Sequence, residues 1–372
     1  MIIKSIRLLN FRNYEQVNIE FPKMIHVLYG KNGQGKTNLL EALYMIGTSK
    51  SYKGIHDQDL INWHQISGSI IVHCIRNDVE QEVKIILSRV QKKELWINNT
   101  KYSSKDFFGF VNEVLFSPDD LQLIKGTPSL RRHFIDMEIS QANAVYYKDL
   151  LQYNRVLSQR NFILKELKSG KHISLEEWDK QLATLAAKLV RKRKEVIYKI
   201  NVLAGMIQHR LTKKESIHLV YYQPYVLTKE AQEADILYAK WYYEALKANV
   251  KEDIYKTYTS IGPHRDDFIV HINGQEAKKY ASQGQQRTAI LSLKLSELEF
   301  IKSETGEYPI LLLDDVMSEL DEQRRLALIK FVRNRIQTFI TTTDPFLFSS
   351  MSDCYYLGIH QGRVSHYGEK AE

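Results

Sequence analysis

The sequence predicts an α/β protein in which a mainly helical block interrupts a mixed α/β domain, and three observations support this fold class. Residues 1–115 are rich in β-branched and aromatic runs. From about Ser129 to Thr212, apolar residues recur at every third or fourth position, which is the spacing of helices. β-like sequence then returns at Asp267–Gly274. We therefore expect one half of the α/β domain at 1–124, an inserted helical lobe at 125–256, and the other half at 257–372.

The first half of the α/β domain is expected to contain a small antiparallel sheet beside a second, mixed sheet. Two turn signals, Asn77-Asp78 and Asn98-Asn99, separate β-rich runs in the way expected of hairpins. The candidate strands are Ile2–Leu8, Val17–Phe21, Ile25–Tyr29, Ser69–Ile75, Val83–Leu87 and Glu94–Ile97.

A glycine-rich loop follows the candidate strand Ile25–Tyr29. Gly30, Gly35, Lys36 and Thr37 fit the pattern G-x-x-x-x-G-K-[ST]. In such a loop, backbone N–H groups wrap a polyphosphate, the lysine reaches the β- and γ-phosphates, and the hydroxyl holds Mg²⁺. The alternative is a chance glycine-rich turn, against which the flanking strand and helix argue. The sequence therefore predicts a site for a nucleoside triphosphate at Gly30, Lys31, Asn32, Gly33, Gln34, Gly35, Lys36, Thr37 and Asn38.

A helix is expected directly after this loop. Leu39, Leu40, Leu43 and Ile46 follow helical spacing, and the N-terminus of the helix would add positive potential beside the phosphates. Gly47 is predicted to end the helix, because glycine is favoured where a helix terminates.

The composition excludes several classes of protein. Cys74 and Cys354 are the two cysteines and lie far apart, so neither a disulfide framework nor a thiolate metal cluster is expected. Lys4, Arg7 and Arg12 interrupt the opening segment, which argues against a signal peptide. No stretch approaches the ~18 apolar residues of a membrane span. We expect a cytoplasmic protein that does not interact with membranes.

Positive charge is concentrated in the middle of the chain. The net charge is +8, whereas Lys125–Lys256 contains 24 basic and 15 acidic residues, which gives +9 there and −1 elsewhere. A solvated helical surface and a face that binds a polyanion are both compatible with this distribution. Arg131 and Arg132, which follow Pro128 at a helix start, are interpreted as local ion-pair partners of Asp136 rather than as contacts to DNA or a partner protein.

The helical lobe is expected to contain a long amphipathic helix. Ser174 and Glu177 form a predicted capping box at its start, and Arg191–Lys194 is interpreted as a solvated cluster within it. Its heptads are too few for an extended coiled coil, so we expect it to pack on neighbouring helices. Ala231–Ala248 is predicted to form another helix.

The second half of the α/β domain carries a pair of acidic residues. Ile310–Leu313 is an apolar run that is followed at once by Asp314 and Asp315. A buried parallel strand of this kind delivers its first carboxylate to a Mg²⁺ ion at the C-terminal edge of the sheet. The next carboxylate points elsewhere and can polarise water as a general base. We therefore predict Asp314 as a metal ligand and Asp315 as a catalytic base.

A second anion site is predicted at the segment SQGQQRT, Ser282–Thr288. Ser282 and Gly284 begin a stretch whose later apolar residues follow helical spacing, and a serine hydroxyl with backbone amides at a helix start can bind an anion. Because Gly30–Thr37 already wraps the phosphates, this site would serve a nucleotide held by another copy of the chain. An ordinary capped helix is the alternative interpretation.

Four of these segments together resemble a known family. YGKNGQGKTN, SQGQQRT, LLLDD and SELD resemble the Walker A, signature, Walker B and D-loop motifs of ABC-type ATPase heads, in the branch that includes the SMC proteins. More narrowly, LNFRNY, LFSPDDLQLIKGTPSLRRHFID, YNRVLSQRN, WDKQLA and SIGPHRDDF resemble the RecF family of bacterial recombination mediators. The resemblance extends over the whole chain and implies an ABC-type ATPase head with an inserted, mainly helical lobe.

The resemblance implies ATP and Mg²⁺ as cofactors. Asn32, Lys36 and Thr37 would bind nucleotide and metal, Asp314 would bind Mg²⁺, and Asp315 would act as the base. The implied activity is a slow ATPase that serves as a switch.

The resemblance also implies residues that act across a dimer. Ser282, as a catalytic residue, and Gly284 and Gln285 would contact the γ-phosphate held by the partner copy. Asp321 would cross the dimer interface, and Arg12 would lie near the phosphates.

Two family features have no clear counterpart in this sequence. ABC-type heads usually carry a histidine after the strand beyond the D-loop, whereas FITTTDP, Phe339–Pro345, stands here, with Thr342 or Thr343 as candidates. The usual glutamine between the lobes is also not evident, although Phe116–Asp120 lies near its expected place.

By resemblance, the expected function is that of an ATP-gated DNA clamp in recombinational repair. Two ATP-bound copies would close on duplex or gapped DNA, and hydrolysis would release them. Expected partners are DNA and the RecO and RecR proteins. One alternative, an SMC-like chromosome protein, would require hundreds of residues of heptads between the two halves. Another, a transport ATPase subunit, would carry a different signature than SQGQQR.

Overall fold

The computed structural model describes residues 1–225, 234–345 and 353–366. The chain divides into two compact units, which are 1–120 with 293–372, and 121–292. The second boundary therefore differs from the predicted one at residue 256. The reason is that strand β10 (Asp267–Ile272) pairs with strand β9 (Ile217–Tyr222) of the lobe, which keeps this part of the chain in the second unit. Among the described residues, the helices are all too short or too polar to cross a bilayer.

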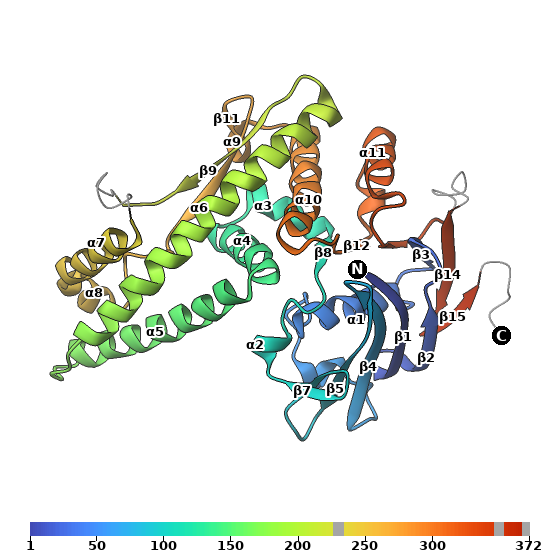
Figure 1. Cartoon of the computed structure of the whole chain (residues 1–372), viewed down its shortest axis with the longest axis horizontal. Helices are drawn as coiled ribbons and strands as arrows, with labels where there is room; N and C mark the ends of the chain where they lie inside the picture. The colour runs from blue at the N-terminus through green and yellow to red at the C-terminus, as the bar shows by residue number, and fades with distance from the viewer. Residues whose placement is uncertain (226–233, 346–352, 367–372) are drawn as a thin grey trace. The chain divides into compact units, whose positions relative to one another are not determined.

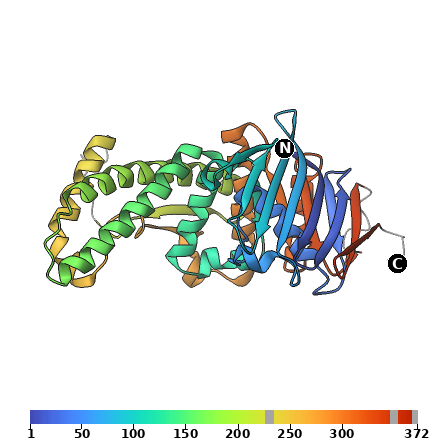
Figure 2. The ribbon, with the colours of Figure 1, turned by 90° about the horizontal axis from the view of Figure 1, so that it is seen from below.

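The first unit contains an antiparallel sheet with strand order β2-β1-β4-β5-β6-β7, whose strands lie side by side in Figure 2. Both predicted hairpins are confirmed, because Asn77, Asp78, Asn98 and Asn99 have positive φ values in the turns that join β4 to β5 and β6 to β7. Asn and Asp tolerate this left-handed conformation better than most residues. The strands are β1 (Ile2–Phe11), β2 (Tyr14–Glu20), β4 (Ser67–Arg76), β5 (Val79–Ser88), β6 (Glu94–Ile97) and β7 (Thr100–Tyr102).

The second sheet of this unit has strand order β15-β14-β3-β13-β12-β8. Its five strands from β14 to β8 are parallel, and β15 is antiparallel to β14. The central strands are buried on both faces, which explains why the sequence shows continuous apolar runs there. The strands are β3 (Ile25–Tyr29), β8 (Glu113–Phe116), β12 (Ile310–Asp314), β13 (Thr338–Thr342), β14 (Cys354–His360) and β15 (Arg363–His366).

Helix α1 (Lys36–Thr48) packs against strands of both sheets and joins one hydrophobic core with them. The prediction that Gly47 ends this helix is wrong, because α1 continues through it to Thr48 and is capped by Ser49 in a left-handed conformation. A Cβ atom at Gly47 would lie 2.5 Å from the carbonyl oxygen of Val111. Gly47 therefore permits close packing rather than a turn. The other helices of the unit are α2 (Ser104–Phe107), α11 (Glu322–Val332) and the second part of α10 (Gln283–Thr305).

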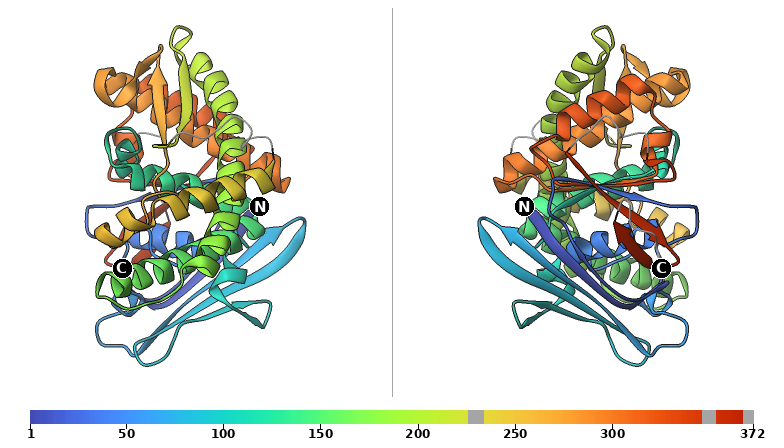
Figure 3. Two further views of the ribbon diagram at one scale, coloured as in Figure 1. Left: turned by 90° about the vertical axis from the view of Figure 1, so that its left-hand side faces the viewer. Right: turned by 90° about the vertical axis from the view of Figure 1, so that its right-hand side faces the viewer.

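The second unit is built around helix α6 (Glu176–Thr212), which packs on α5, α7 and β9 (Figures 1 and 3). The predicted capping box differs in detail, since the Ser174 hydroxyl accepts the Glu176 N–H and Leu175 occupies the cap position. Residues 231–233 of the helix predicted at Ala231–Ala248 lie outside the described residues. The elements are α3 (Gln122–Lys125), α4 (Pro128–Ala142), α5 (Ala144–Lys168), β9 (Ile217–Tyr222), α7 (Asp235–Ala248), α8 (Val250–Lys256), β10 (Asp267–Ile272), β11 (Gln275–Glu276) and α9 (Ala277–Tyr280).

Two predictions about arginines in the lobe are corrected by tertiary contacts. Arg193 is not solvated, because it is buried and forms an ion pair of 2.8 Å with Asp136. Arg131 is a structural residue as predicted, but its partner is Asp267 at 2.7 Å rather than Asp136. Arg132 donates to the backbone oxygen of Asp266 at 2.8 Å.

Candidate nucleotide-binding site

The glycine-rich loop connects β3 to α1 in the first unit and requires glycine at two positions. Gly30 and Gly35 have φ values of 153° and 118°. A Cβ atom at Gly30 would lie 2.3 Å from the carbonyl oxygen of Ile359, and one at Gly35 would lie 2.7 Å from the Asn13 side chain. Any larger residue would therefore both strain the backbone and displace neighbouring atoms.

Lys36 in this loop is folded back over the backbone that precedes it. Its Nζ atom donates to the backbone oxygens of Gly30 at 2.6 Å and Lys31 at 2.9 Å. Burial lowers the pKa of Lys36, and the nearby carboxylates of Asp315 and Asp314 oppose that effect. The ammonium group is therefore satisfied by weak local acceptors that a phosphate oxygen can replace.

The loop is held in place by residues far from it in sequence. Asn13 donates from its side chain to the backbone oxygen of Gln34 at 2.9 Å and accepts from Asn38 at 2.8 Å. The Gln34 side chain accepts the backbone N–H of Gln361 at 2.9 Å, and Gly362 donates to its backbone oxygen at 3.0 Å. The turn between β14 and β15 thus braces the loop, and the side chain of Gln34 is directed to that turn.

Asp314 at the end of β12 lies beside Thr37 at the start of α1, as the sequence predicts for two ligands of one metal ion. The Thr37 hydroxyl donates to Asp314 Oδ1 at 3.1 Å. Thr341 also donates to Asp314 Oδ1, at 3.0 Å, and the Tyr52 hydroxyl donates to Oδ2 at 2.7 Å. The carboxylate therefore accepts three hydroxyl groups from three separate segments of the chain.

Asp315 faces a cavity that these segments enclose. Its φ of 56° is left-handed, and its backbone N–H donates to Thr341 Oγ1 at 2.9 Å. Burial raises the pKa of Asp315, and the Lys36 ammonium opposes that effect. The cavity has a volume of about 270 Å³ and is lined by Asn32, Gly33, Gly35, Lys36, Thr37, Asn38, Lys53, Asp315 and Thr341.

The side chain of Arg12 is directed to a buried carboxylate. Its Nε and Nη2 atoms donate to the two oxygens of Glu41 at 3.0 and 3.1 Å. Arg12 is not among the residues that line the cavity. Placement of Arg12 near the phosphates stays a prediction, whereas its neighbour Asn13 touches the loop directly.

Ser282, Gly284 and Gln285 stand at the start of α10, within the second unit. The Ser282 backbone N–H donates to Gln285 Oε1 at 2.9 Å, and the Gln285 N–H donates to the Ser282 hydroxyl at 3.3 Å. This reciprocal pair is a capping box. Ser282 itself is exposed. The structure thus contains the capped helix of the alternative interpretation, with its N-terminus open to solvent.

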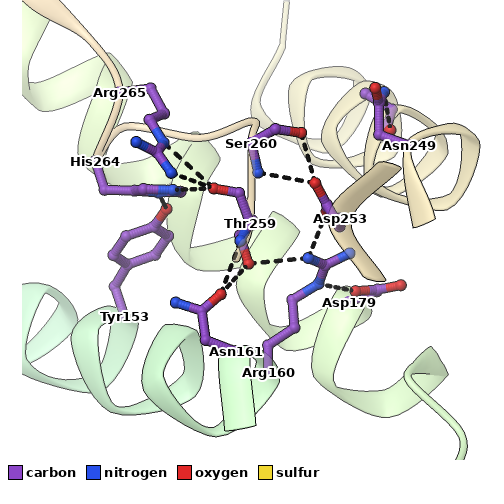
Figure 4. Close-up of polar contacts among 11 residues, drawn as sticks. Tyr153, Arg160, Asn161, Asp179, Asn249, Asp253, Thr259, Ser260, His264 and Arg265 are labelled. Atoms are coloured by element: carbon purple, nitrogen blue, oxygen red, sulfur yellow. Dashed lines mark hydrogen bonds and ion pairs between the residues drawn. The ribbon is translucent and has the colours of Figure 1, made fainter. Parts of the chain in front are cut away.

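A buried network in the second unit joins residues from three segments that were quoted above for their family resemblance, YNRVLSQRN, WDKQLA and SIGPHRDDF (Figure 4). Arg160 of α5 is fully buried and donates to Asp179 at 2.6 Å and to Asp253 at 2.7 Å. Its third partner is the Thr259 hydroxyl, at 2.9 Å. The ring nitrogens of His264 form hydrogen bonds with the Tyr153 hydroxyl and the Thr259 backbone oxygen, and no group of His, Cys, Asp or Glu side chains among the described residues could hold a metal ion with it.

A family profile for the RecF/RecN/SMC N terminal domain matches residues 2–366. The chain is 46% identical over 344 residues to the DNA replication and repair protein RecF of Alkaliphilus oremlandii, covering 92% of this chain and 93% of that protein. It is 40% identical over 370 residues to RecF of Clostridium kluyveri, covering 98% and 100%. The chain belongs to the RecF family.

Solved structures agree with this membership in the RecF family. A structure described as the recombination mediator protein RecF with ATP in the RecFOR pathway has a TM-score of 0.91 and 33% identity, covering 99% of this chain and 98% of that one. An SMC head bound to the C-terminal winged-helix domain of ScpA has a TM-score of 0.58 at 13% identity, covering 98% and 97%, which shows a shared fold.

The segments considered in place of the histidine and the glutamine of ABC-type heads have defined contacts. Among the threonines of Phe339–Pro345, Thr341 lines the cavity, whereas the Thr342 hydroxyl donates to the backbone oxygen of Asp344 at 3.2 Å and Thr343 is exposed. Asp120 at the end of Phe116–Asp120 forms an ion pair of 3.1 Å with Lys294. Thr341, Tyr52, Lys53 and Asn13 were missed by sequence reasoning, because their roles depend on contacts across the unit.

Proposed function

We propose that this chain is an ATP-dependent DNA-binding protein of recombinational repair, in which ATP drives two copies to close on duplex or gapped DNA. The observation that carries the proposal is the juxtaposition of Lys36, Thr37 and Asp315 around one cavity, with Asp314 hydrogen-bonded to Thr37 beside it. Similarity over nearly the whole chain to a RecF structure described with ATP supports it.

The residues around the cavity suit a nucleoside triphosphate with Mg²⁺. Gly30 and Gly35 permit the backbone to curve where a side chain would not fit, and Lys36 supplies a partly desolvated positive charge. The Thr37 hydroxyl and Asp314 carboxylate are hard oxygen donors, which Mg²⁺ prefers in small numbers beside phosphates. When bound, Mg²⁺ would neutralise developing negative charge on the phosphates.

The residues of the chain would divide the work of hydrolysis. Lys36 would release its backbone acceptors and hold phosphate oxygens through charge-assisted hydrogen bonds. Asp315 would orient an attacking water and accept its proton, a role that its position on the cavity and raised pKa suit. We expect slow turnover, so that ATP acts as a switch.

A second copy would complete the site. Ser282, Gly284 and Gln285 lie in a different compact unit from the glycine-rich loop, and the capped N-terminus of α10 is exposed. Asp321 is also exposed, at the N-terminus of α11, where it accepts the Arg324 N–H at 2.9 Å. We propose that Ser282 contacts the γ-phosphate held by the partner copy and that Asp321 lies at the interface between copies.

The charge of the lobe and the family membership support DNA and partner proteins as ligands of this chain. Lys125–Lys256 carries a net charge of +9, which favours contacts to phosphates rather than to base edges. The RecFOR pathway in the description of the similar structure supports RecO and RecR as partners. The proposed role is to help load recombinase onto gapped DNA.

Light scattering with and without ATP and Mg²⁺ tests the proposal. We expect a monomer without nucleotide and a dimer with ATP and Mg²⁺, with Lys36→Met remaining monomeric in both. A chain that binds and hydrolyses ATP while staying monomeric at all concentrations would contradict the clamp.

A further inference from the structure

The carboxylate of Asp314 is fixed from three sides by neutral donors. Thr37 of α1 and Thr341 of β13 donate to Oδ1 at 3.1 and 3.0 Å, and Tyr52, in the segment after α1, donates to Oδ2 at 2.7 Å. Because all three donors are uncharged, they orient the carboxylate without neutralising it. Its negative charge stays available for a cation.

Thr341 connects this carboxylate to the next residue. While its hydroxyl donates to Asp314, the same oxygen accepts the backbone N–H of Asp315 at 2.9 Å. Asp315 has a φ of 56°, a left-handed conformation that is uncommon for non-glycine residues, although Asp tolerates it better than most. One hydroxyl thus fixes both the direction of Asp314 and the backbone that aims Asp315 at the cavity.

Tyr52 also packs against α1. Its ring lies edge-on against Tyr44 of α1, with ring centres 5.4 Å apart, and its neighbour Lys53 lines the cavity. This ring contact places the hydroxyl beside Asp314. Groups that hold a metal ligand in this way commonly change metal affinity by 10- to 100-fold when removed.

We propose that Tyr52 and Thr341 are positioning residues of the ATPase site, with separable roles. Tyr52 sets the affinity for Mg²⁺ by holding Asp314 toward Thr37. Thr341 does the same and, in addition, sets the geometry of the candidate base Asp315. This inference rests on the proposed function.

Tyr52→Phe removes one hydroxyl and little else. In a titration of a fluorescent ATP analogue with Mg²⁺, we expect the half-saturating Mg²⁺ concentration to rise about tenfold. Nucleotide affinity in EDTA and turnover at saturating Mg²⁺ should stay close to wild type. Tyr102→Phe, on β7 at 37% exposure, is the matched control and should change nothing.

Thr341→Val keeps the shape of the side chain and removes its hydroxyl. We expect a similar rise in the Mg²⁺ requirement and, unlike for Tyr52→Phe, a turnover at saturating Mg²⁺ that falls at least tenfold. Thr341→Ser should restore both values. The neighbouring Thr342→Val is the matched control, because the Thr342 hydroxyl donates to Asp344 instead.

The experiments distinguish a failure of the proposed Mg²⁺ site from a failure of the positioning roles of Tyr52 and Thr341. If wild-type nucleotide binding ignores Mg²⁺, the proposed function is wrong at the metal site. If the wild type responds to Mg²⁺ but Tyr52→Phe requires the same concentration, the positioning role of Tyr52 is overturned. If Thr341→Val lowers only thermal stability and Thr341→Ser restores only that, Thr341 is merely structural.

Discussion

The loop around Lys36 and the network around Arg160 both gather charged side chains, yet their hydrogen bonding differs. Among the described residues, the Lys36 ammonium donates to the backbone oxygens of its own loop, and the side chain lies on a cavity with Asp315. Arg160 is fully buried and bonded to two carboxylates and a hydroxyl. The first arrangement can exchange backbone acceptors for a ligand, whereas the second holds charged acceptors inside the core, where Arg160 Nη2 has no hydrogen-bond partner among the described residues. The bonding of a charged group thus indicates whether it serves binding or folding.

The largest expected effect is on nucleotide binding at the loop. Lys36→Met should lower ATP affinity by about 100-fold or more, because it removes a cation that would make charge-assisted bonds to phosphates. The loop should still fold, since Asn13 and Gln361 brace it independently. A fluorescent nucleotide titration measures the effect, with Lys105→Met, exposed on α2 and away from the cavity, as the control. Unchanged affinity would refute the assignment of the loop.

At the buried network around Arg160, a substitution is expected to lower stability and leave nucleotide binding unchanged. Arg160→Met should lower the free energy of unfolding by about 3–5 kcal/mol, because Asp179 and Asp253 would be left buried without their partner. ATP affinity of the folded protein should be unchanged. Urea unfolding measures the effect, and Arg155→Met, exposed on the same helix α5, should shift it by about 0.5 kcal/mol or less. If Arg160→Met instead keeps normal stability and loses ATP binding, the assignment of the network to folding rather than to binding would be wrong.

Ser282 lies between these two cases, because its hydroxyl already caps a helix and is also exposed. Ser282→Asp keeps an acceptor for the cap but places a negative charge where the partner's phosphates would approach. We expect monomer ATP affinity to be retained and ATP-driven dimerisation to fall at least tenfold by light scattering. Ser282→Asn, a neutral cap, is the control. If the Asp variant dimerises as the Asn variant does, Ser282 serves only the helix.

The smallest effect is expected at His26, a third kind of buried polar group. Neither ring nitrogen has a hydrogen-bond partner among the described residues, and Phe21, Phe339 and Tyr355 surround the ring. Burial, followed by the charge of Lys23, lowers the pKa of His26 to about 3.

The sign of the pH dependence at His26 follows from proton binding. The unfolded chain takes up this proton near pH 6.5, so the contribution to stability is complete above that pH. It is lost as the pH falls toward 3, by about 1.4 kcal/mol per pH unit. His26→Phe should therefore lose less stability between pH 7 and 5.5 in urea unfolding. The exposed His73→Phe should behave as wild type.

Local patterns predicted the parts of the molecule that local chemistry determines. The strand Ile25–Tyr29, the loop and the Asp314–Thr37 pair follow from apolar runs and from residue types that phosphate and Mg²⁺ require. Gly47 was misread because its close neighbour is Val111, and Arg193 because its partner is Asp136. Such contacts join residues distant in sequence, and no periodicity in one segment indicates them.

The same distance limited the prediction of the site. Tyr52 and Thr341 resemble any buried tyrosine or threonine until the chain brings them to Asp314. The second boundary differs from the one expected at residue 256 for a similar reason. Strand β10 pairs with strand β9 of the lobe, and the composition of the sequence does not reveal this pairing.

The brace between Gln34 and the turn at Gln361 joins residues 327 positions apart, which has a consequence during synthesis. At ~5–20 residues per second, the ribosome needs on the order of 15 to 65 seconds between making the two. Strand β3 takes both of its neighbours, β13 and β14, from the late part of the chain. The nascent protein must therefore keep two apolar strand edges unpaired for that interval, and chaperones have most reason to engage it there.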